Sequence, residues 1–168
     1  MPAPSDRPLD ALGLARSGAL IEREFPLAGF PRLRDRLAEP AGTAKARAAF
    51  GLAAQWPAVK LAVEAEVVLT CQRCLRPVRL RLASESRLAF AEEGAPELPE
   101  DCEAIGEDPR KLDLAALVED ELLLGLPLIP QHEADQECAL PGGGEESDGE
   151  PTVEMRRPFA GLKDLLKH

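Results

Sequence analysis

The chain has 168 residues, of which 30 are acidic and 20 basic, and its formal net charge is −10. This length is typical of one domain. The sequence has no run of 18 apolar residues, which excludes a transmembrane helix. Its first residues lack the basic and apolar regions of a secretory signal, so we expect a cytoplasmic protein. The acidic net charge also argues against general nucleic-acid binding, because phosphate repels it.

The charge is divided unevenly along the chain. Residues 1–90 carry a net charge of +5 and residues 91–121 a net charge of −10. Residues 122–130 carry no charge, residues 131–154 carry −8, and residues 155–168 carry +3. The average of −10 therefore hides a basic first half, and a division of this kind points to partners of opposite charge.

Strands are predicted through the first half of the chain. Apolar and polar residues alternate there with a period of two, which is typical of half-buried antiparallel strands. The predicted strands are residues 20–27, 44–52, 59–69 and a fourth that begins at Val78. Pro31 occupies a favourable first position for a short helix over residues 31–38.

One central helix is predicted in the second half. Residues 91–109 form an acidic loop with a short strand near residues 102–105. Asp113 can then cap a helix over residues 114–125, which Pro127 ends. Its apolar face is formed by Leu114, Leu117, Val118, Leu122 and Leu126, with Glu121 in the middle.

The last residues differ in composition. Residues 141–154 are rich in glycine and acids, which predicts disorder. Residues 155–168 predict a short basic amphipathic helix with Phe159, Leu162, Leu165 and Leu166 on one side. We therefore expect an α+β fold, a mainly antiparallel β-sheet packed by one central helix, with a short C-terminal helix. Its parts are an N-terminal extension (1–19), the domain (20–140), a disordered acidic linker (141–154) and the basic helix (155–168).

The cysteines indicate a metal site. Four cysteines in a cytoplasmic chain of this size do not suggest a disulfide framework. Cys71 and Cys74 have the spacing of two zinc ligands in a turn, and His132 and Cys138 could complete a tetrahedral set. The alternatives are a redox dithiol and packing as small apolar side chains. Cys102 has no partner at a ligand spacing, so we interpret it as an ordinary thiol.

Five arginines cluster around the predicted hairpin. They are Arg73, Arg76, Arg79, Arg81 and Arg87. Guanidinium groups in a row suit phosphate oxygens, which favours an RNA contact. The alternative is that they neutralise the acidic second half of the chain. No aromatic residue is interleaved, so base stacking is not supported.

Three consecutive acids lie on the central helix. Glu119 and Asp120 are predicted to face water or the side of the helix, where they could bind a basic partner. Glu121 lies on the apolar face, which is costly unless it is paired, and we expect a structural bridge to an arginine. We also assign structural roles to Pro127 and Pro130. The sequence shows no catalytic triad and no phosphate-binding loop, so we do not expect an enzyme.

Three segments together resemble the YceD family of bacterial and plastid proteins. They are CQRCL, DLAALVEDELLLGLPLIPQHE with a following cysteine, and RRPFAGLKDLLK. The resemblance covers roughly residues 20–168 and implies a cytosolic factor needed for normal levels of large-subunit (23S) rRNA, without a known catalytic activity. The motif positions are Cys71, Arg73, Cys74, Glu119, Asp120, Glu121, Pro127, Pro130, His132 and Cys138.

These observations favour a non-enzymatic ribosome biogenesis factor whose arginine hairpin contacts rRNA or a precursor ribosomal particle. One alternative is an acidic interaction module that binds a basic ribosomal protein without touching RNA. Another is a zinc- or thiol-dependent accessory to an rRNA-processing nuclease. Zinc is the cofactor to test, and we expect no membrane partner.

Overall fold

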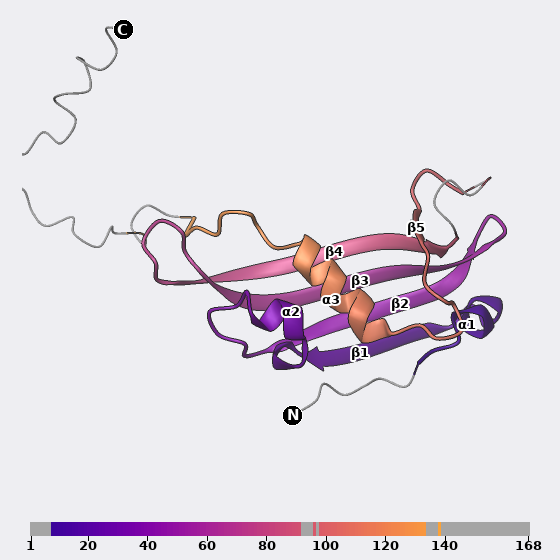
Figure 1. The fold of residues 1–168 in the computed structure, drawn as a ribbon, viewed down its shortest axis with the longest axis horizontal. Coiled ribbons are helices and arrows are strands. Elements are labelled where there is room, and N and C mark those ends of the chain that lie inside the picture. Colours follow the sequence, from indigo (N-terminus) through magenta and orange to yellow (C-terminus); the bar gives the residue numbers. More distant parts are fainter. Residues whose placement is uncertain (1–7, 92–95, 97, 134–137, 139–168) are drawn as a thin grey trace, which may run out of the picture.

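A five-stranded sheet is the main element of the fold (Figure 1). The computed structural model describes residues 8–91, 96, 98–133 and 138. The predictions for residues 141–154 and 155–168 lie outside these ranges. The α+β class and the mainly antiparallel sheet are confirmed.

The strands follow one another in sequence order across the sheet. They are β1 (Leu20–Pro26), β2 (Thr43–Ala53), β3 (Trp56–Thr70), β4 (Pro77–Phe90) and β5 (Glu103–Ile105). The first four pair antiparallel, and the short β5 pairs parallel with the end of β4. The predicted strands are confirmed with small shifts of their ends, because period-two alternation is a strong signal when one face is buried.

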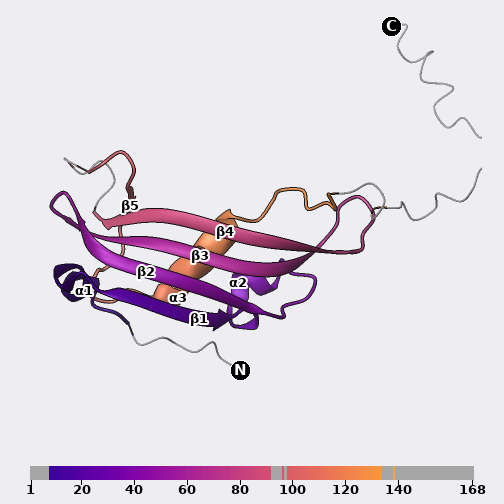
Figure 2. The ribbon, with the colours of Figure 1, turned by 180° about the vertical axis from the view of Figure 1, so that it is seen from behind.

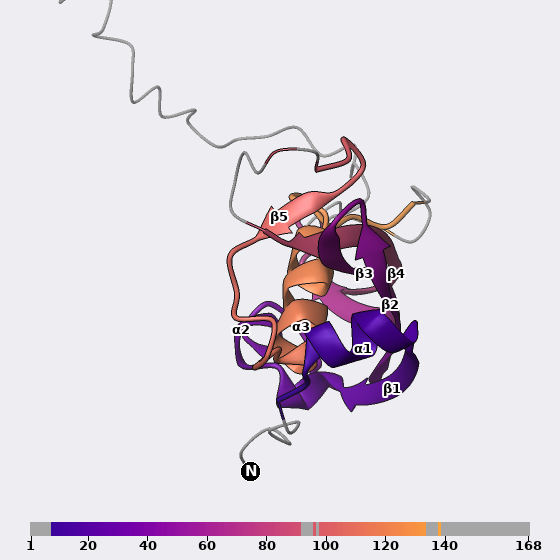
Figure 3. The same ribbon diagram turned by 90° about the vertical axis from the view of Figure 1, so that its right-hand side faces the viewer.

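One face of the sheet is covered by helices and the other is open (Figures 1 and 2). Apolar side chains of β2, β3 and β4 point to the covered face, as Ala46, Leu61 and Leu82 illustrate. The polar residues between them point to the open face. An end view shows α1 and α3 on the same side of the curved sheet (Figure 3).

The central helix α3 spans Leu114–Leu124 and begins where the sequence predicts. The Asp113 side chain accepts hydrogen bonds from the N–H groups of Ala115 and Ala116, which satisfies the free donors of the first turn. The helix ends at Leu124 and is capped by Gly125, two residues before Pro127. None of the described helices combines the length and apolar character needed to cross a membrane.

Two features near the N-terminus differ from the prediction. Helix α1 (Ala11–Ser17) lies within the predicted extension, and its Ala11 and Ala15 are buried against the core. The helix predicted over residues 31–38 is shortened to α2 (Pro31–Arg34), which follows a 3-10 turn, η1 (Leu27–Gly29). The chain leaves α2 early because the Ala38 N–H donates to the Val68 carbonyl, 2.8 Å away, and draws this segment alongside β3.

Candidate metal centre

A tight turn joins β3 to β4 and carries Cys71 and Cys74. The Cys71 N–H donates to the Arg76 carbonyl, and the Leu75 N–H donates to the Cys71 carbonyl, both at 2.9 Å. Leu75 adopts a left-handed backbone conformation with φ of 60°. A leucine there is strained because its Cβ crowds the backbone, so the turn is held by its surroundings.

The segment after α3 returns to this turn. The Gln72 N–H donates to the Pro130 carbonyl at 2.8 Å, so Pro130 contacts the cysteine turn. The His132 ring reaches the start of β4, where Nε2 lies 3.1 Å from the Pro77 carbonyl. Because that oxygen can only accept, Nε2 donates this hydrogen bond, and Nδ1, which faces the cysteines, is the ring atom that would bind a metal.

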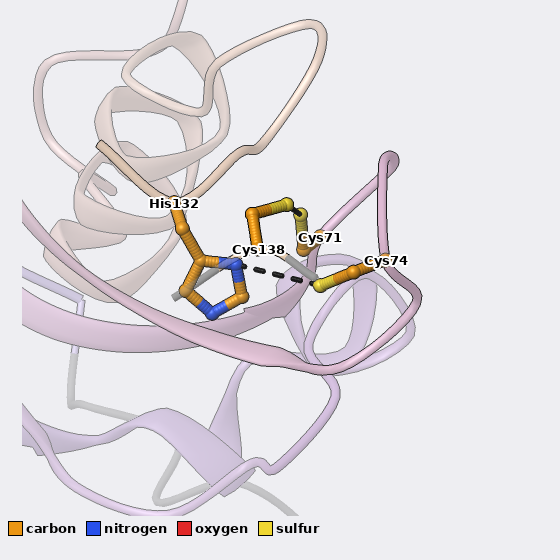
Figure 4. A group of neighbouring side chains, drawn as sticks. All are labelled: Cys71, Cys74, His132 and Cys138. Carbon is orange, nitrogen blue, oxygen red and sulfur yellow. Dashed lines mark hydrogen bonds between the residues drawn. The ribbon is translucent and has the colours of Figure 1, made fainter. Parts of the chain in front are cut away.

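Four side chains converge between the turn and this segment (Figure 4). The Cys71 and Cys138 sulfurs are 3.6 Å apart, and the Cys74 sulfur lies 3.6 Å from Nδ1 of His132. All four ligand atoms lie within 4.8 Å of one another. The three cysteines are buried and His132 is half-buried. The predicted ligand set is therefore brought together, although its members lie up to 67 residues apart in sequence.

These distances fit a tetrahedral zinc site. Zinc–sulfur bonds of about 2.3 Å place two sulfur ligands about 3.8 Å apart, close to the observed separation of Cys71 and Cys138. Cys71, Cys74, His132 and Cys138 would be the ligands. Three thiolates and one imidazole are a common donor set of structural zinc sites, which use four protein ligands.

The Cys71 thiol is the most acidic of the cluster. Burial acts to raise its pKa, but the backbone N–H groups of Cys74, Arg73 and His132, with the His132 ring, lower the pKa to about 5. N–H groups that point at a sulfur stabilise its thiolate form, and the thiolate is the form that binds a metal. The turn is therefore preorganised for a cation.

The pKa values of the other three candidate ligands are also shifted from their ordinary values. Burial also opposes ionisation of Cys74, but hydrogen bonds from the backbone and side chain of Arg76 lower its pKa. A hydrogen bond with Cys71 raises the pKa of His132. Burial, and then the neighbouring cysteines, raise the pKa of Cys138 to about 11. A metal ion bound by these groups would displace their protons and would favour the thiolate form of all three cysteines.

The predicted hairpin is formed by β3 and β4, and its five arginines take part in interactions within the protein. Arg79 and Arg81 lie on the open face, as alternation predicts, and pair with Glu66 and Glu64 of β3 at 3.4 and 2.8 Å. They therefore neutralise acids of the first half of the chain. Arg87 pairs with an acid of the second half, Asp101, at 2.7 Å.

Glu119 is buried, which contradicts the expectation that it faces water or the side of the helix. Its carboxylate accepts the N–H groups of Arg32 and Leu33 at 2.7 and 3.0 Å, and it forms a salt bridge with the Arg32 guanidinium. The same guanidinium pairs with the half-exposed Asp120 at 2.6 Å. Glu119 thus connects α3 to α2. These contacts also compensate its buried charge, which would otherwise be costly inside the protein.

Glu121 is buried on the apolar face as predicted, but its partner is not an arginine. The Ser84 hydroxyl of β4 donates to its carboxylate at 2.5 Å. A serine fits here because the covered face of β4 lies directly under α3. Cys102 lies apart from the metal centre, in a small apolar cluster with Ala53, Ala58 and Ala89.

The fold and this site define a class: a small α+β domain whose sheet carries a buried three-cysteine, one-histidine cluster at one end. The family model described as "Large ribosomal RNA subunit accumulation protein YceD" matches residues 59–166. This match covers more than half of the chain, so the protein belongs to the YceD family. The predicted resemblance is confirmed.

A curated relative carries the same description as the family model. The large ribosomal RNA subunit accumulation protein YceD of Haemophilus influenzae is 36% identical over 110 residues, which are 61% of this chain and 62% of the relative. The chain thus spans less than two thirds of the relative's length. No solved structure matches the chain.

Proposed function

We propose that this protein is a non-enzymatic factor that supports accumulation of large-subunit (23S) rRNA in the cytoplasm. Its family and the name of its relative support this role. The single structural observation that supports the proposal is the cluster of Cys71, Cys74, His132 and Cys138, because two of its members lie in the turn that also carries Arg73 and Arg76.

Zinc in this cluster would act as a structural cross-link. It would join the β3–β4 turn to the segment that follows α3. Four protein ligands leave no open position for a substrate, whereas a catalytic zinc keeps one. The donor set therefore supports an architectural role rather than hydrolysis, and it favours a binding factor over a nuclease accessory.

RNA would bind at Arg73, Arg76, Arg79, Arg81 and Arg87, on the turn and on β4. The pairs that Arg79 and Arg81 form with Glu66 and Glu64 are solvent-exposed on both sides. Exposed pairs of this kind contribute about 0–1 kcal/mol each, so a phosphate could displace the glutamates. Such binding should be modest and should weaken as salt rises.

The role is tested in cells that lack the protein. The ratio of 23S to 16S rRNA should fall in these cells, and a plasmid copy of the natural sequence should restore it. A Cys71→Ser copy should restore it poorly, while the matched Cys102→Ala copy should restore it fully. A 23S to 16S ratio that does not change when the protein is removed would overturn the proposed role.

Direct RNA contact is tested by filter binding of a 23S rRNA precursor at two salt concentrations. The double change Arg79→Glu and Arg81→Glu should abolish binding. The matched control is Lys45→Glu and Arg47→Glu, which changes the same charge on the same open face but on β2. Equal losses from both double variants would show only a general charge effect and would contradict the assignment.

A basic ribosomal protein is the second candidate partner. Glu103 of β5 and, in the segment that follows, Glu107 and Asp108 are exposed, and Asp120 is half-exposed beside Arg32. Co-purification of a basic ribosomal protein that survives nuclease treatment would favour this partner over RNA. Loss of the partner on nuclease treatment would favour the RNA contact.

A further inference from the structure

An apolar groove lies at the end of α3 and is not used by the proposed RNA surface. It has a volume of about 500 Å³ and is lined by Arg36, Leu69, Leu123, Leu126, Pro127, Leu128 and Pro130. Leu124, Leu128 and Ile129, in the same uncharged stretch, are 78%, 100% and 63% exposed. Contiguous exposed apolar residues of this kind mark an interaction site.

The groove adjoins the metal centre. Pro130, which lines the groove, accepts a hydrogen bond from Gln72 in the cysteine turn. Cys138 lies in the cluster, 3.6 Å from the Cys71 sulfur. The chain therefore continues beyond Cys138 from a point close to the groove, with thirty further residues to place.

We propose that residues 155–168 of the same chain occupy this groove. The predicted helix of this segment puts Phe159, Leu162, Leu165 and Leu166 on one side, and its charged residues fall outside that side. A helix this short is marginal in water without a packing partner. The groove supplies an apolar surface, and the tail's bases would point away from Arg36.

The connecting chain has a suitable length. Residues 139–154 form a tether of sixteen residues that is rich in glycine and acids. The root-mean-square span of such a tether is about 20–24 Å. A short tether gives an effective concentration on the order of millimolar, so weak apolar packing is sufficient for docking.

The extent of the family match is consistent with a single structural unit that contains both the groove and the tail. The match runs from residue 59 to residue 166, so it includes every groove-lining residue except Arg36 and most of the tail but excludes β1 and β2. Docking would also bring the tail's basic residues next to the turn that carries Arg73 and Arg76. The inference itself does not depend on RNA binding, and a failure in either test leaves the other unaffected.

Amide hydrogen exchange of the full chain tests the docking. Amides of residues 159–168 should exchange on the order of tenfold more slowly than in a Phe159→Asp variant, because docking protects them. Leu128→Asp should remove the same protection. This leucine is fully exposed in the described structure, so the substitution should leave the fold intact. The matched control is Leu52→Asp on β2, which should leave the tail protected.

Three results would overturn the proposal. The first is fast exchange of the tail in the unmodified chain. The second is protection that Phe159→Asp removes but Leu128→Asp does not, since the tail would then dock elsewhere. The third is protection that disappears on dilution together with a dimer in analytical ultracentrifugation, which would assign the groove to a second copy of the chain.

Discussion

Buried cysteines lie at both ends of the β3–β4 hairpin, in opposite chemical settings. At the turn, backbone N–H groups outweigh burial and lower the pKa of Cys71 to about 5. At the other end, burial dominates and raises the pKa of Cys102 among alanines. Both side chains are under 9% exposed. Burial alone therefore does not make a cysteine a ligand; donors aimed at the sulfur and further ligands within reach do.

Metal removal should reveal the largest difference in stability and zinc binding between the two ends of the β3–β4 hairpin. The purified chain should hold one zinc ion, and chelation should lower its free energy of unfolding by about 4 kcal/mol when free zinc is a thousandfold above its Kd. Cys71→Ser should abolish zinc binding, because it removes one of four ligands. Cys102→Ala should retain the zinc and cost about 1 kcal/mol.

Elemental analysis and chemical denaturation with and without chelator measure these effects. Sub-stoichiometric zinc in protein prepared without chelator would contradict the metal assignment. A loss of zinc in Cys102→Ala would erase the contrast between the two ends.

Thiol ionisation should show the same contrast in the zinc-free chain. Ultraviolet thiolate absorbance should show one step near pH 5 from Cys71, whereas Cys102 and Cys138 should ionise above the ordinary thiol range. Because folding lowers the pKa of Cys71, its contribution to stability is complete above the unfolded pKa and is lost as pH falls through about 5. Cys71→Ser should remove the early step, while an early step that persists would assign it to another group.

Backbone strain can be compared at the two ends of β3. Leu75 in the cysteine turn and Ala54 between β2 and β3 both have positive φ, at 60° and 53°. Leu75→Gly and Ala54→Gly should each stabilise the fold by about 1 kcal/mol, because glycine adopts this conformation without a clash. Ala49→Gly within β2 is the control and should destabilise by about 0.5–1 kcal/mol. Urea denaturation measures all three, and destabilisation by Leu75→Gly would mean that its side chain contributes more than its strain costs.

The smallest expected effect on stability concerns the Arg87–Asp101 pair, at the end of the β3–β4 hairpin that lies near Cys102. A hydrogen bond from Arg87 lowers the pKa of Asp101 below its ordinary value of 3.8. The pair therefore stabilises the fold above that pH, and the contribution is lost as pH falls through the lowered pKa. Arg87→Gln should raise the pKa of Asp101, as measured by NMR titration, with little change in stability because the pair is exposed. An unchanged titration would show that the pair does not form in solution.

Local patterns were sufficient for most of the fold. Period-two alternation predicted β1 to β4, because one face of each strand is buried and the other is solvated. Asp113 predicted the start of α3 through its capping chemistry. α1 was missed because its Ala11 and Ala15 give only a weak apolar signal, and α2 was overextended because its end depends on a hydrogen bond to the distant Val68.

The four candidate ligands could be named from the sequence because thiols and imidazoles are few in this chain and their spacing limits the choices. The acids could not be assigned in this way, because carboxylates are abundant and their partners depend on packing. Glu119 meets Arg32 across 87 residues, and Glu121 meets Ser84 across 37.

The sequence alone was enough for the class of fold, the arginine hairpin and the four candidate ligands, since each depends on periodicity or on rare side chains. Tertiary packing determined which charged side chains pair with one another and which are buried. Strand register pairs Arg79 and Arg81 with Glu66 and Glu64, and helix packing buries Glu119. The physical reason is that electrostatic partners are chosen by distance in space, which local sequence patterns do not encode.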